Sequence, residues 1–435
     1  MERLAAFVQE HIADDTSRLI LNRAKWPEID MDLAVNCIES RRKLRGKVQE
    51  WYDEPGLIFP RKLSAEQCSS SATGRFKAEV AEEISRLASC ARNDSEENIR
   101  NDGFRLADLT GGLGVDSWFF SKKASHVLYC EMLPELCEAA RHNFQVLGAD
   151  NITVLNAAVG TSDTTSVFKS PTEILSGFNP DIVYMDPARR GEGGKKVFLI
   201  EECTPDVLTL KDELFSISRH ILIKLSPMAD ISMVCERLGT TCREVHVVAA
   251  GGECKELLVW MDREWNDEYT IHAVEMHKNE NCTKFSFRPS EERSSASLRM
   301  NGEALRTSEG AGAYLFEPGK ALMKAGAFNL TAERFGLHKL GLSTHYYIFN
   351  DEDKVETLKG YGKVFSIIRS ELLDKRTLKA AGKEFPHSEV TARNIPMDTE
   401  SLRKKMGITS GDDAHIFGLK SDSEGALLFI TTPIR

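Results

Sequence analysis

The 435-residue chain lacks the features that mark several special classes of protein. No uninterrupted apolar run approaches the length of a transmembrane helix, and the N-terminus does not have the pattern of a secretory signal. The ten cysteines contain no Cys-x-x-Cys pair, so we expect reduced, buried thiols and neither a disulfide framework nor a metal site. Internal repeats and low-complexity tracts are also missing. These absences favour a cytoplasmic globular protein of two to four domains, with no membrane partner.

The chain also lacks an excess of positive charge. Its net charge is −10 and its isoelectric point is about 5.7, which excludes a protein that binds nucleic acid over its whole surface. Any RNA site must therefore be a local basic patch. One candidate patch is the run of five cations from Arg41 to Lys47, for which a solvated helix face is the alternative. The second candidate, with the same alternative, comprises Lys375, Arg376, Lys379, Lys383, Arg393, Arg403, Lys404 and Lys405.

The segment from Phe104 to Asp116 is the stretch around which the rest of the sequence is organised. Residues 106–109 are an apolar run that predicts a buried strand, a glycine-rich turn follows, and residues 115–123 have the pattern of a helix. Glycines let the backbone approach a ligand closely, and the free N–H groups at the start of a helix attract a negative group. The segment therefore predicts a nucleotide-binding unit, with an ordinary tight turn as the alternative.

Two features of this turn favour S-adenosylmethionine (SAM) over a dinucleotide. A dinucleotide fingerprint has a third glycine where this chain has Ser117. Asp108 ends the strand before the turn, where its carboxylate is placed to accept hydrogen bonds from the ammonium group of SAM or from backbone amides. SAM also has a carboxylate that suits the start of the helix, whereas NAD has a pyrophosphate. An NAD-dependent enzyme is the alternative interpretation.

The next two predicted strands end in polar residues that suit the rest of the cofactor. Glu131 ends the strand predicted over residues 126–131, near the spacing at which an acid meets the ribose hydroxyls in doubly wound folds. Asn156 ends the strand predicted over residues 151–157, where an amide suits the adenine. A surface acid and a plain loop asparagine are the alternatives. The predicted cofactor-binding residues are Asp108, Thr110, Gly112, Gly114, Asp116, Glu131, Met132, Asn156 and Ala157.

A second chemical site is predicted at Asp186-Pro187. The strand over residues 182–185 brings Asp186 to the carboxyl edge of the sheet, where open α/β sheets bind their ligands. Methyl transfer is an in-line displacement, so the enzyme mainly has to position the nucleophile. We expect Asp186 and Pro187 to orient it, and Arg189 or Arg190 to hold phosphate. No cysteine follows Pro187, so the covalent route of carbon-5 pyrimidine methylation has no support; an ordinary strand-ending turn is the alternative.

The pattern of elements predicts a helical N-terminal region, a central α/β domain and a small α+β C-terminal part. The pattern of residues 63–92 predicts a capped helix. A more specific hypothesis is that Glu66, Gln67 and Thr73 close over the SAM pocket. Strands and helices alternate over 104–262, where five parallel strands closed by a hairpin at Gly251-Gly252 form a doubly wound, Rossmann-like sheet. In the C-terminal part, helices are expected over 369–381 and 398–406 among strands.

These motifs resemble those of a known family in their order and spacing. Class I SAM-dependent methyltransferases are matched by Asp108-Leu-Thr-Gly-Gly-Leu-Gly114, Glu131, Asn156-Ala157 and Asp186-Pro-Ala-Arg-Arg190. Nearly the whole chain is similar to a bacterial family that joins this domain to a ferredoxin-like segment and a C-terminal THUMP-like domain. Its specific marks, besides the Asp186 motif, are Glu66-Gln67-Cys-Ser-Ser, Lys224-Leu-Ser-Pro227, Tyr314-Leu-Phe-Glu-Pro318 and Arg393-Asn-Ile-Pro396.

Three positions depart from the usual methyltransferase pattern. Thr110 replaces the usual first glycine of the SAM loop, and Asn156 replaces the usual acid at the adenine position. The tetrapeptide that begins at Asp186 has no aromatic residue to stack on a flipped base, which argues against an amino-group target.

The resemblance implies domain boundaries and a substrate class, because THUMP domains belong to RNA-modifying enzymes. We predict a SAM-dependent methyltransferase, with a monomer favoured, that methylates a base nitrogen or hydroxyl of structured RNA (tRNA or rRNA) directly. The alternatives are a protein or small-molecule methyltransferase and a SAM-binding module that recognises RNA without modifying it. The predicted domains are a helical region at 1–62, the SAM-dependent methyltransferase domain at 63–265, a ferredoxin-like or connecting segment at 266–345, and a THUMP-like α+β domain at 346–435.

Overall fold

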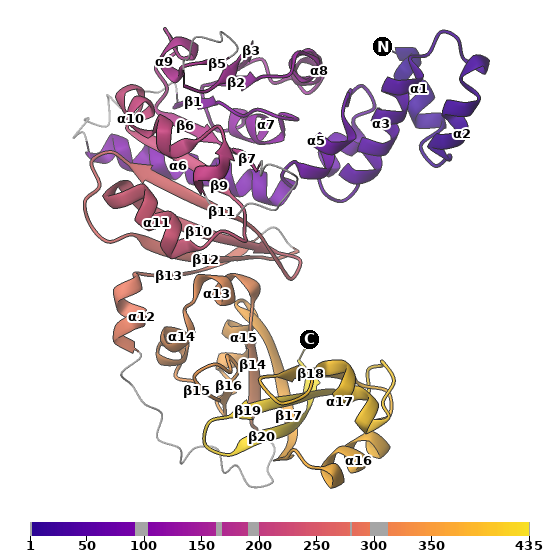
Figure 1. The fold of residues 1–435 in the computed structure, drawn as a ribbon, viewed down its shortest axis with the longest axis vertical. Coiled ribbons are helices and arrows are strands. Elements are labelled where there is room, and N and C mark those ends of the chain that lie inside the picture. Colours follow the sequence, from indigo (N-terminus) through magenta and orange to yellow (C-terminus); the bar gives the residue numbers. More distant parts are fainter. Residues whose placement is uncertain are drawn as a thin grey trace. The chain divides into compact units, whose positions relative to one another are not determined.

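The computed structural model describes residues 2–91, 103–161, 168–189, 200–278, 281–295 and 312–434 (Figure 1). The chain divides into two compact units. The first comprises Met1–Val245 with Glu256–Asp267, and the second comprises His246–Lys255 with Glu268–Arg435.

The first unit begins with the helical region that the spacing of apolar residues predicts. Trp51 and Phe59 are fully buried in it, and Asp15 and Asp30 cap α2 and α3 by accepting backbone N–H groups of the first helical turn. No helix in the described ranges, α6 included, combines the length and apolar character needed to cross a membrane. The helices are α1 (Glu2–Glu10), α2 (Thr16–Leu21), α3 (Met31–Leu44), α4 (Gln49–Asp53), α5 (Lys62–Gln67) and α6 (Ser71–Ala91).

A parallel sheet forms the core of the first unit, as the alternation of strands and helices predicted. The strand order is β11-β9-β6-β1-β2-β3, and β11 alone is antiparallel to its neighbour. The chain runs outward from β1 through β2 to β3 and then returns to β6 on the other side, so the strand order switches between β1 and β6. Open sheets of this kind bind ligands at the carboxyl ends of the strands at that switch. The strands are β1 (Arg105–Asp108), β2 (His126–Glu131), β3 (Ile152–Asn156), β6 (Ile182–Met185), β9 (His220–Leu225) and β11 (Glu253–Asp262).

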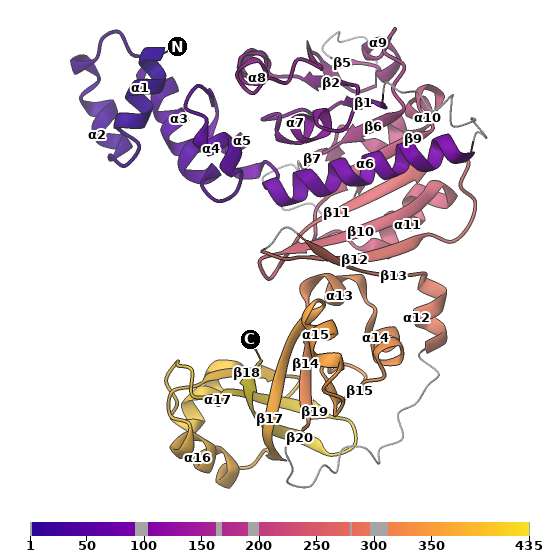
Figure 2. The same ribbon diagram turned by 180° about the vertical axis from the view of Figure 1, so that it is seen from behind.

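Helices cover both faces of this sheet, which explains why its strands are nearly continuous apolar runs. All four residues of β6 are buried. Helices α10 and α11 lie in front of the sheet in Figure 1, and α6 lies in front of it in the reverse view of Figure 2. The other elements of the unit are α7 (Val115–Ser121), α8 (Pro134–Val146), β4 (Ala158–Val159), β5 (Phe168–Lys169), α9 (Pro171–Ile174), β7 (Ala188–Arg189), β8 (Cys203–Thr204), α10 (Val207–Ile217) and α11 (Ile231–Leu238).

The second unit contains an antiparallel strand pair and a separate seven-stranded sheet. The pair is β12 with β13, and the sheet has the order β15-β16-β14-β17-β20-β19-β18, in which only β18 and β19 are parallel to each other. The predicted two-residue turn at Gly251-Gly252 follows β10, with positive φ values of 61° and 80°. Strand β10 (Cys242–Ala250) begins in the first unit and ends in the second. The other strands of the second unit are β12 (Thr270–Met276), β13 (Cys282–Phe287), β14 (Tyr314–Pro318), β15 (His338–Lys339), β16 (Tyr347–Phe349), β17 (Gly362–Leu372), β18 (Glu389–Arg393), β19 (His415–Ser421) and β20 (Gly425–Pro433).

One element of this unit was predicted wrongly. The helix expected over residues 369–381 begins only at Lys375, because Asp374 caps it, and it ends at Glu384. Arg369–Leu372 instead belong to β17 and pair with β20. Pairing along β20 therefore overrides the local helical pattern there. The helices of the unit are α12 (Pro289–Ser295), α13 (Lys320–Ala325), α14 (Phe328–Phe335), α15 (Lys354–Lys359), α16 (Lys375–Glu384) and α17 (Thr399–Met406).

Candidate active site

The glycine turn after β1 is held against the end of β2. Gly112 and Gly114 have φ values of 56° and 93°, in the left-handed region that glycine adopts without strain. The N–H of Gly112 donates to Glu131 Oε2 at 2.9 Å, and its carbonyl accepts the hydroxyl of Tyr129 at 2.6 Å. A Cβ added to Gly111 would lie 2.2 Å from the Tyr129 ring, so this glycine is required for close packing. The backbone of the turn is thus fixed where a ligand at the switch between β1 and β6 would meet it.

Asp108, at the end of β1, is a buried carboxyl without a cationic partner. It is 1% exposed, and its oxygens accept the N–H of Thr110 at 3.0 Å and the hydroxyl of Ser117 at 2.6 Å. Burial raises the pKa of Asp108 from 3.8 to about 7, although these two hydrogen bonds act in the opposite direction. No lysine, arginine or histidine of the described residues forms an ion pair with it. A carboxyl in this state gains from a cationic ligand.

Glu131 is hydrogen-bonded to several of the other predicted cofactor-binding residues near the ends of β2 and β3. One of its oxygens accepts the N–H of Gly112 and the other a backbone N–H two residues later, at 2.8 Å, so each keeps a lone pair for a ligand. The side-chain amide of Asn156 donates to the Glu131 carbonyl at 2.8 Å, and the N–H of Ala157 donates to the same carbonyl at 3.0 Å. The Met132 side chain is 43% exposed. These residues form one group beside the glycine turn.

Asp116 belongs to a different group from the other predicted cofactor residues. Its Oδ2 accepts the hydroxyls of Ser69 at 2.9 Å and Tyr184 at 2.8 Å, and its Oδ1 lies 3.3 Å from the ammonium nitrogen of Lys77. Lys77 is fully buried and also donates to both oxygens of Glu256, at 2.9 and 3.1 Å. Asp116 is therefore part of a buried ionic cluster formed by α6, α7, β6 and β11.

Asp186 lies at the end of β6, next to β1, as predicted. Its N–H donates to the hydroxyl of Thr110 at 2.6 Å, so the residue that replaces the usual glycine ties the turn to β6. Its Oδ2 accepts a hydrogen bond from the ammonium group of Lys224 at 2.5 Å. The Asp186 side chain is 37% exposed, the Lys224 side chain is 13% exposed, and Pro187 is buried. Asp186 is thus the accessible carboxylate of this edge.

The predicted arginine contacts are only partly described. Arg189 lies in β7, whose pairing with β8 places it opposite Cys203. The side chain of Arg189, all of Arg190 and the loop expected over 191–196 lie outside the described residues.

The basic run from Arg41 to Lys47 has members in different surroundings: Arg41 is buried, which corrects its interpretation as solvated or RNA-contacting, whereas Arg42, Lys43 and Arg45 are exposed. Arg41 is 4% exposed, and its guanidinium donates to four backbone carbonyls at 2.7–3.1 Å. Arg42 donates to two carbonyls of residues 12–14, and the Lys47 ammonium donates to two carbonyls of residues 65–66. Lys43 pairs with a carboxylate at 3.7 Å.

The residues expected to close over the cofactor have local partners. Thr73 is 2% exposed, and its hydroxyl is hydrogen-bonded within the Ser70–Thr73 turn that starts α6. Glu66 pairs with Lys43, and Gln67 is exposed. Ser70 thus caps α6 by accepting the N–H of Thr73, and Thr73 takes part in the cap, which was the simpler interpretation.

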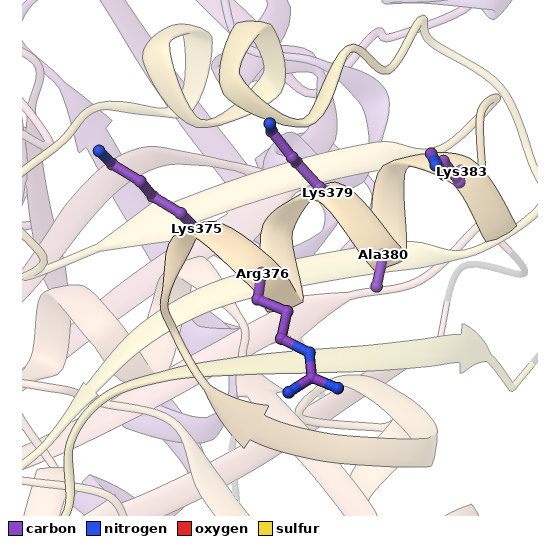
Figure 3. A pocket seen from close by; sticks show the side chains of 5 residues that line it. All are labelled: Lys375, Arg376, Lys379, Ala380 and Lys383. Carbon is purple, nitrogen blue, oxygen red and sulfur yellow. The ribbon is translucent and has the colours of Figure 1, made fainter.

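In the second unit, an uncompensated basic surface lies on α16. Leu378, Ala381 and Gly382 form the buried face of this helix, and its four cations are exposed. No carboxylate of the described residues forms an ion pair with these cations, whereas Arg403 and Lys404 on α17 pair with Glu400. Figure 3 shows Lys375 and Lys379 projecting from one side of α16 and Arg376 from the other. A surface pocket of about 550 Å³ is lined by Lys375, Arg376, Lys379, Ala380 and Lys383.

Two family models match parts of the second unit. Residues 314–354 match a ferredoxin-like domain, and residues 362–433 match a THUMP domain-like model. No curated protein sequence matches the chain significantly. A crystal structure of a candidate methyltransferase from Porphyromonas gingivalis is 28% identical and has a TM-score of 0.78, with 100% of this chain and 98% of that chain covered.

Two human structures have lower TM-scores. A methyltransferase 10 domain containing protein is 12% identical, with a TM-score of 0.39 over 52% of this chain and 96% of that chain. The N-terminal domain of METTL16 in complex with SAH is 13% identical, with a TM-score of 0.34 over 55% of this chain and 84% of that chain.

The chain combines a class I methyltransferase fold with ferredoxin-like and THUMP-like domains. Within the methyltransferase fold, sequence reasoning missed Lys77, Glu256 and Lys224. Lys77 lies between Arg75 and Glu79, and Glu256 follows Lys255, so the sequence does not distinguish either residue from ordinary surface charges. Lys224 was recognised only as a family mark, although it is the charged residue near the end of β9, the neighbour of β6.

Proposed function

We propose that the protein is a SAM-dependent methyltransferase that acts on structured RNA. The observation that carries the proposal is the position of Asp186. It is an accessible carboxylate at the carboxyl end of β6, joined through Thr110 to the glycine turn at the switch between β1 and β6. Polar groups at that edge of a class I methyltransferase fold are suited to meet both the cofactor and the atom to be methylated.

The surroundings of Asp108 and Glu131 support SAM as the cofactor. Asp108 offers a buried carboxyl to an ammonium group, and this position is unfavourable for the pyrophosphate of NAD. Glu131 has one lone pair left on each oxygen, which suits two adjacent ribose hydroxyls. When bound, SAM supplies an electrophilic methyl group on sulfur.

The contribution of the protein to methyl transfer would be to orient the nucleophile. Asp186 Oδ1 and the Pro187 carbonyl are acceptors for the N–H or O–H proton of an attacking base nitrogen or hydroxyl. Alignment of this kind is worth several orders of magnitude in rate for an in-line displacement. No cysteine directly follows Pro187, so we propose direct transfer without a covalent protein intermediate.

The second unit supports RNA as the substrate class. A THUMP-like domain occupies residues 362–433, and its helix α16 carries four exposed cations that form no ion pair with a carboxylate of the described residues. Phosphates of an RNA backbone are the natural counter-charges for such a surface, since binding releases their condensed counterions. The net charge of −10 for the whole chain makes this local patch more selective.

The deciding experiment compares modified nucleosides, by mass spectrometry, in total RNA from cells with and without the gene. We expect one methylnucleoside to disappear, to return with the wild-type gene, and not to return with Asp186→Ala. Calorimetry should show binding of SAM and its demethylated product by the purified protein, and none of NAD. An unchanged nucleoside profile with labelled methyl in protein or a metabolite would refute the RNA substrate. Binding of NAD without SAM would refute the cofactor, and SAM binding without any transfer would indicate a recognition module.

A further inference from the structure

The buried ionic cluster behind Asp186 has no part in the function proposed so far, and Lys224 connects it to the exposed edge. Lys224 lies on β9, which runs parallel to β6 in a register that pairs Met185 with Ile223. This register places the Lys224 ammonium beside the Asp186 carboxylate, 2.5 Å from Oδ2. Lys224 is mostly buried, whereas Asp186 is more than a third exposed. The lysine thus holds the carboxylate from its protein side.

The charge of Lys224 is maintained by Asp186 together with two buried carboxylates. Burial lowers the pKa of Lys224, but three nearby carboxylates outweigh burial and raise it above its ordinary value. Two of these, Asp116 and Glu256, are themselves buried and are fixed by Lys77. Lys77 and Lys224 together balance that buried acid pair, which leaves Asp186 as the additional negative charge at the edge.

We infer that Lys224 is a positioning residue for methyl transfer: its ammonium group holds one oxygen of Asp186 and so presents the other to the proton of the RNA nucleophile. The inference rests on the proposed function. A carboxylate without such a partner rotates freely about its side-chain bonds and offers two equivalent acceptors. With Oδ2 held by Lys224 and the backbone N–H held by Thr110, Oδ1 is the acceptor left for the substrate.

A double-mutant cycle on the full-length protein tests this role. The variants are Lys224→Met, Asp186→Asn and their combination, assayed with methyl-labelled SAM and total RNA from cells that lack the gene. We expect Lys224→Met to lower kcat about 100-fold, as misplacement of a reacting group by about 1 Å does, and to leave the KM for SAM within about threefold. Because Lys224 acts through Asp186, the combined variant should be no slower than the slower single variant. Additive losses, or wild-type kcat in Lys224→Met, would overturn the inference.

Two further variants separate positioning from a loss of folding. Lys224→Arg keeps the charge and should recover at least about tenfold in kcat over Lys224→Met, because the carboxylate regains a donor. If Lys224→Met does not fold, the cycle is run with Lys224→Arg, which should slow the wild type but not the Asp186→Asn variant. Lys123→Met removes an exposed cation paired with Glu82 and is the control that should keep full activity. An inactive wild type would overturn the proposed function and this inference together, whereas an active wild type with an additive cycle overturns only the inference.

Discussion

The basic run at residues 41–47 and the basic face of α16 are similar in sequence, but Arg41 of the run and the cations of α16 have opposite surroundings. Arg41 is 4% exposed and is bound to four backbone carbonyls, whereas Lys375, Lys379 and Lys383 are exposed and have no carboxylate partner among the described residues. The difference shows that the density of cations in a sequence does not identify an RNA surface. A cation is available to RNA only where the fold does not already supply carbonyl or carboxylate oxygens that accept its hydrogen bonds.

Arg41→Ala should destabilise the fold around the basic run at residues 41–47. The variant leaves the carbonyls of residues 52, 54, 55 and 57 without a donor, so we expect a loss of about 4–5 kcal/mol in the free energy of unfolding. Chemical denaturation followed by tryptophan fluorescence measures the loss. Arg45→Ala removes an exposed cation of the same run and should change stability little. Unchanged stability in Arg41→Ala would contradict the structural role of this arginine.

Asp108 is the opposite case to Arg41: it is a buried carboxyl that forms no ion pair with a described residue, and its protonation should make stability depend on pH. Its folded-state pKa of about 7 lies above the ordinary 3.8, so the folded protein binds more protons than the unfolded chain between these values. The stability contributed by this group is therefore full below pH 3.8 and is lost as the pH rises to about 7, a change of about 4 kcal/mol. The measurement is the difference in unfolding free energy between the wild type and Asp108→Asn across this range, without cofactor. A difference that does not change with pH would contradict the assignment.

The same carboxyl should make SAM binding depend on pH. The ionised form of Asp108 is the one that attracts an ammonium group, so SAM affinity should rise with pH through about 7 and binding should release a proton. Calorimetry in buffers of different ionisation enthalpy detects the released proton. Asp108→Asn should bind SAM more weakly and without this pH dependence.

Removing the cations of α16 should weaken RNA binding without affecting the methyltransferase fold. The triple variant Lys375→Ala, Lys379→Ala, Lys383→Ala should lose about 2 kcal/mol of RNA affinity and should reduce the slope of log affinity against log salt by about 2–3. The buried face of α16 is untouched, so the melting temperature should stay the same. Binding is measured by fluorescence anisotropy on structured RNA at several salt concentrations, with SAM affinity as a second readout that should not change.

The matched control lies on the neighbouring helix α17. Lys404 is exposed like the α16 cations but lies 3.7 Å from the Glu400 carboxylate. Lys404→Ala should therefore have a smaller effect on RNA affinity than any single α16 substitution. An equal effect would mean that an ion-pair partner does not decide which cations contact RNA.

The fold could be read from the sequence because its strands are continuous apolar runs that end in recognisable turns. Strand β6 has its predicted bounds, and Asp108, Glu131, Asn156 and Asp186 lie at strand ends as the alternating pattern requires. The helix predicted over 369–381 was displaced because a partner strand, β20, competes for its first residues. Local patterns contain no information about such a partner.

The ionic cluster could not be predicted for the same reason. Lys77 and Glu256 are 179 positions apart, and each becomes interpretable only once the other is known to be beside it. The burial of Arg41 likewise depends on backbone carbonyls up to 16 positions along the chain, which accept its hydrogen bonds only in the folded protein. Charged residues that the fold uses internally therefore look, in sequence, like residues left for a ligand.

The smallest expected effect is also the one that most directly tests the comparison. Lys43 is a half-exposed cation of the 41–47 run, with a 3.7 Å ion pair to Glu66. Exposed pairs contribute below about 0.5 kcal/mol, so Lys43→Ala should leave the unfolding free energy nearly unchanged. If α16 alone contacts RNA, the variant should also keep wild-type RNA affinity and salt dependence. A loss of RNA affinity as large as that of a single α16 substitution would show that exposed members of the run contact RNA. The contrast between the two regions would then hold only for Arg41, Arg42 and Lys47, whose side chains donate hydrogen bonds to backbone carbonyls.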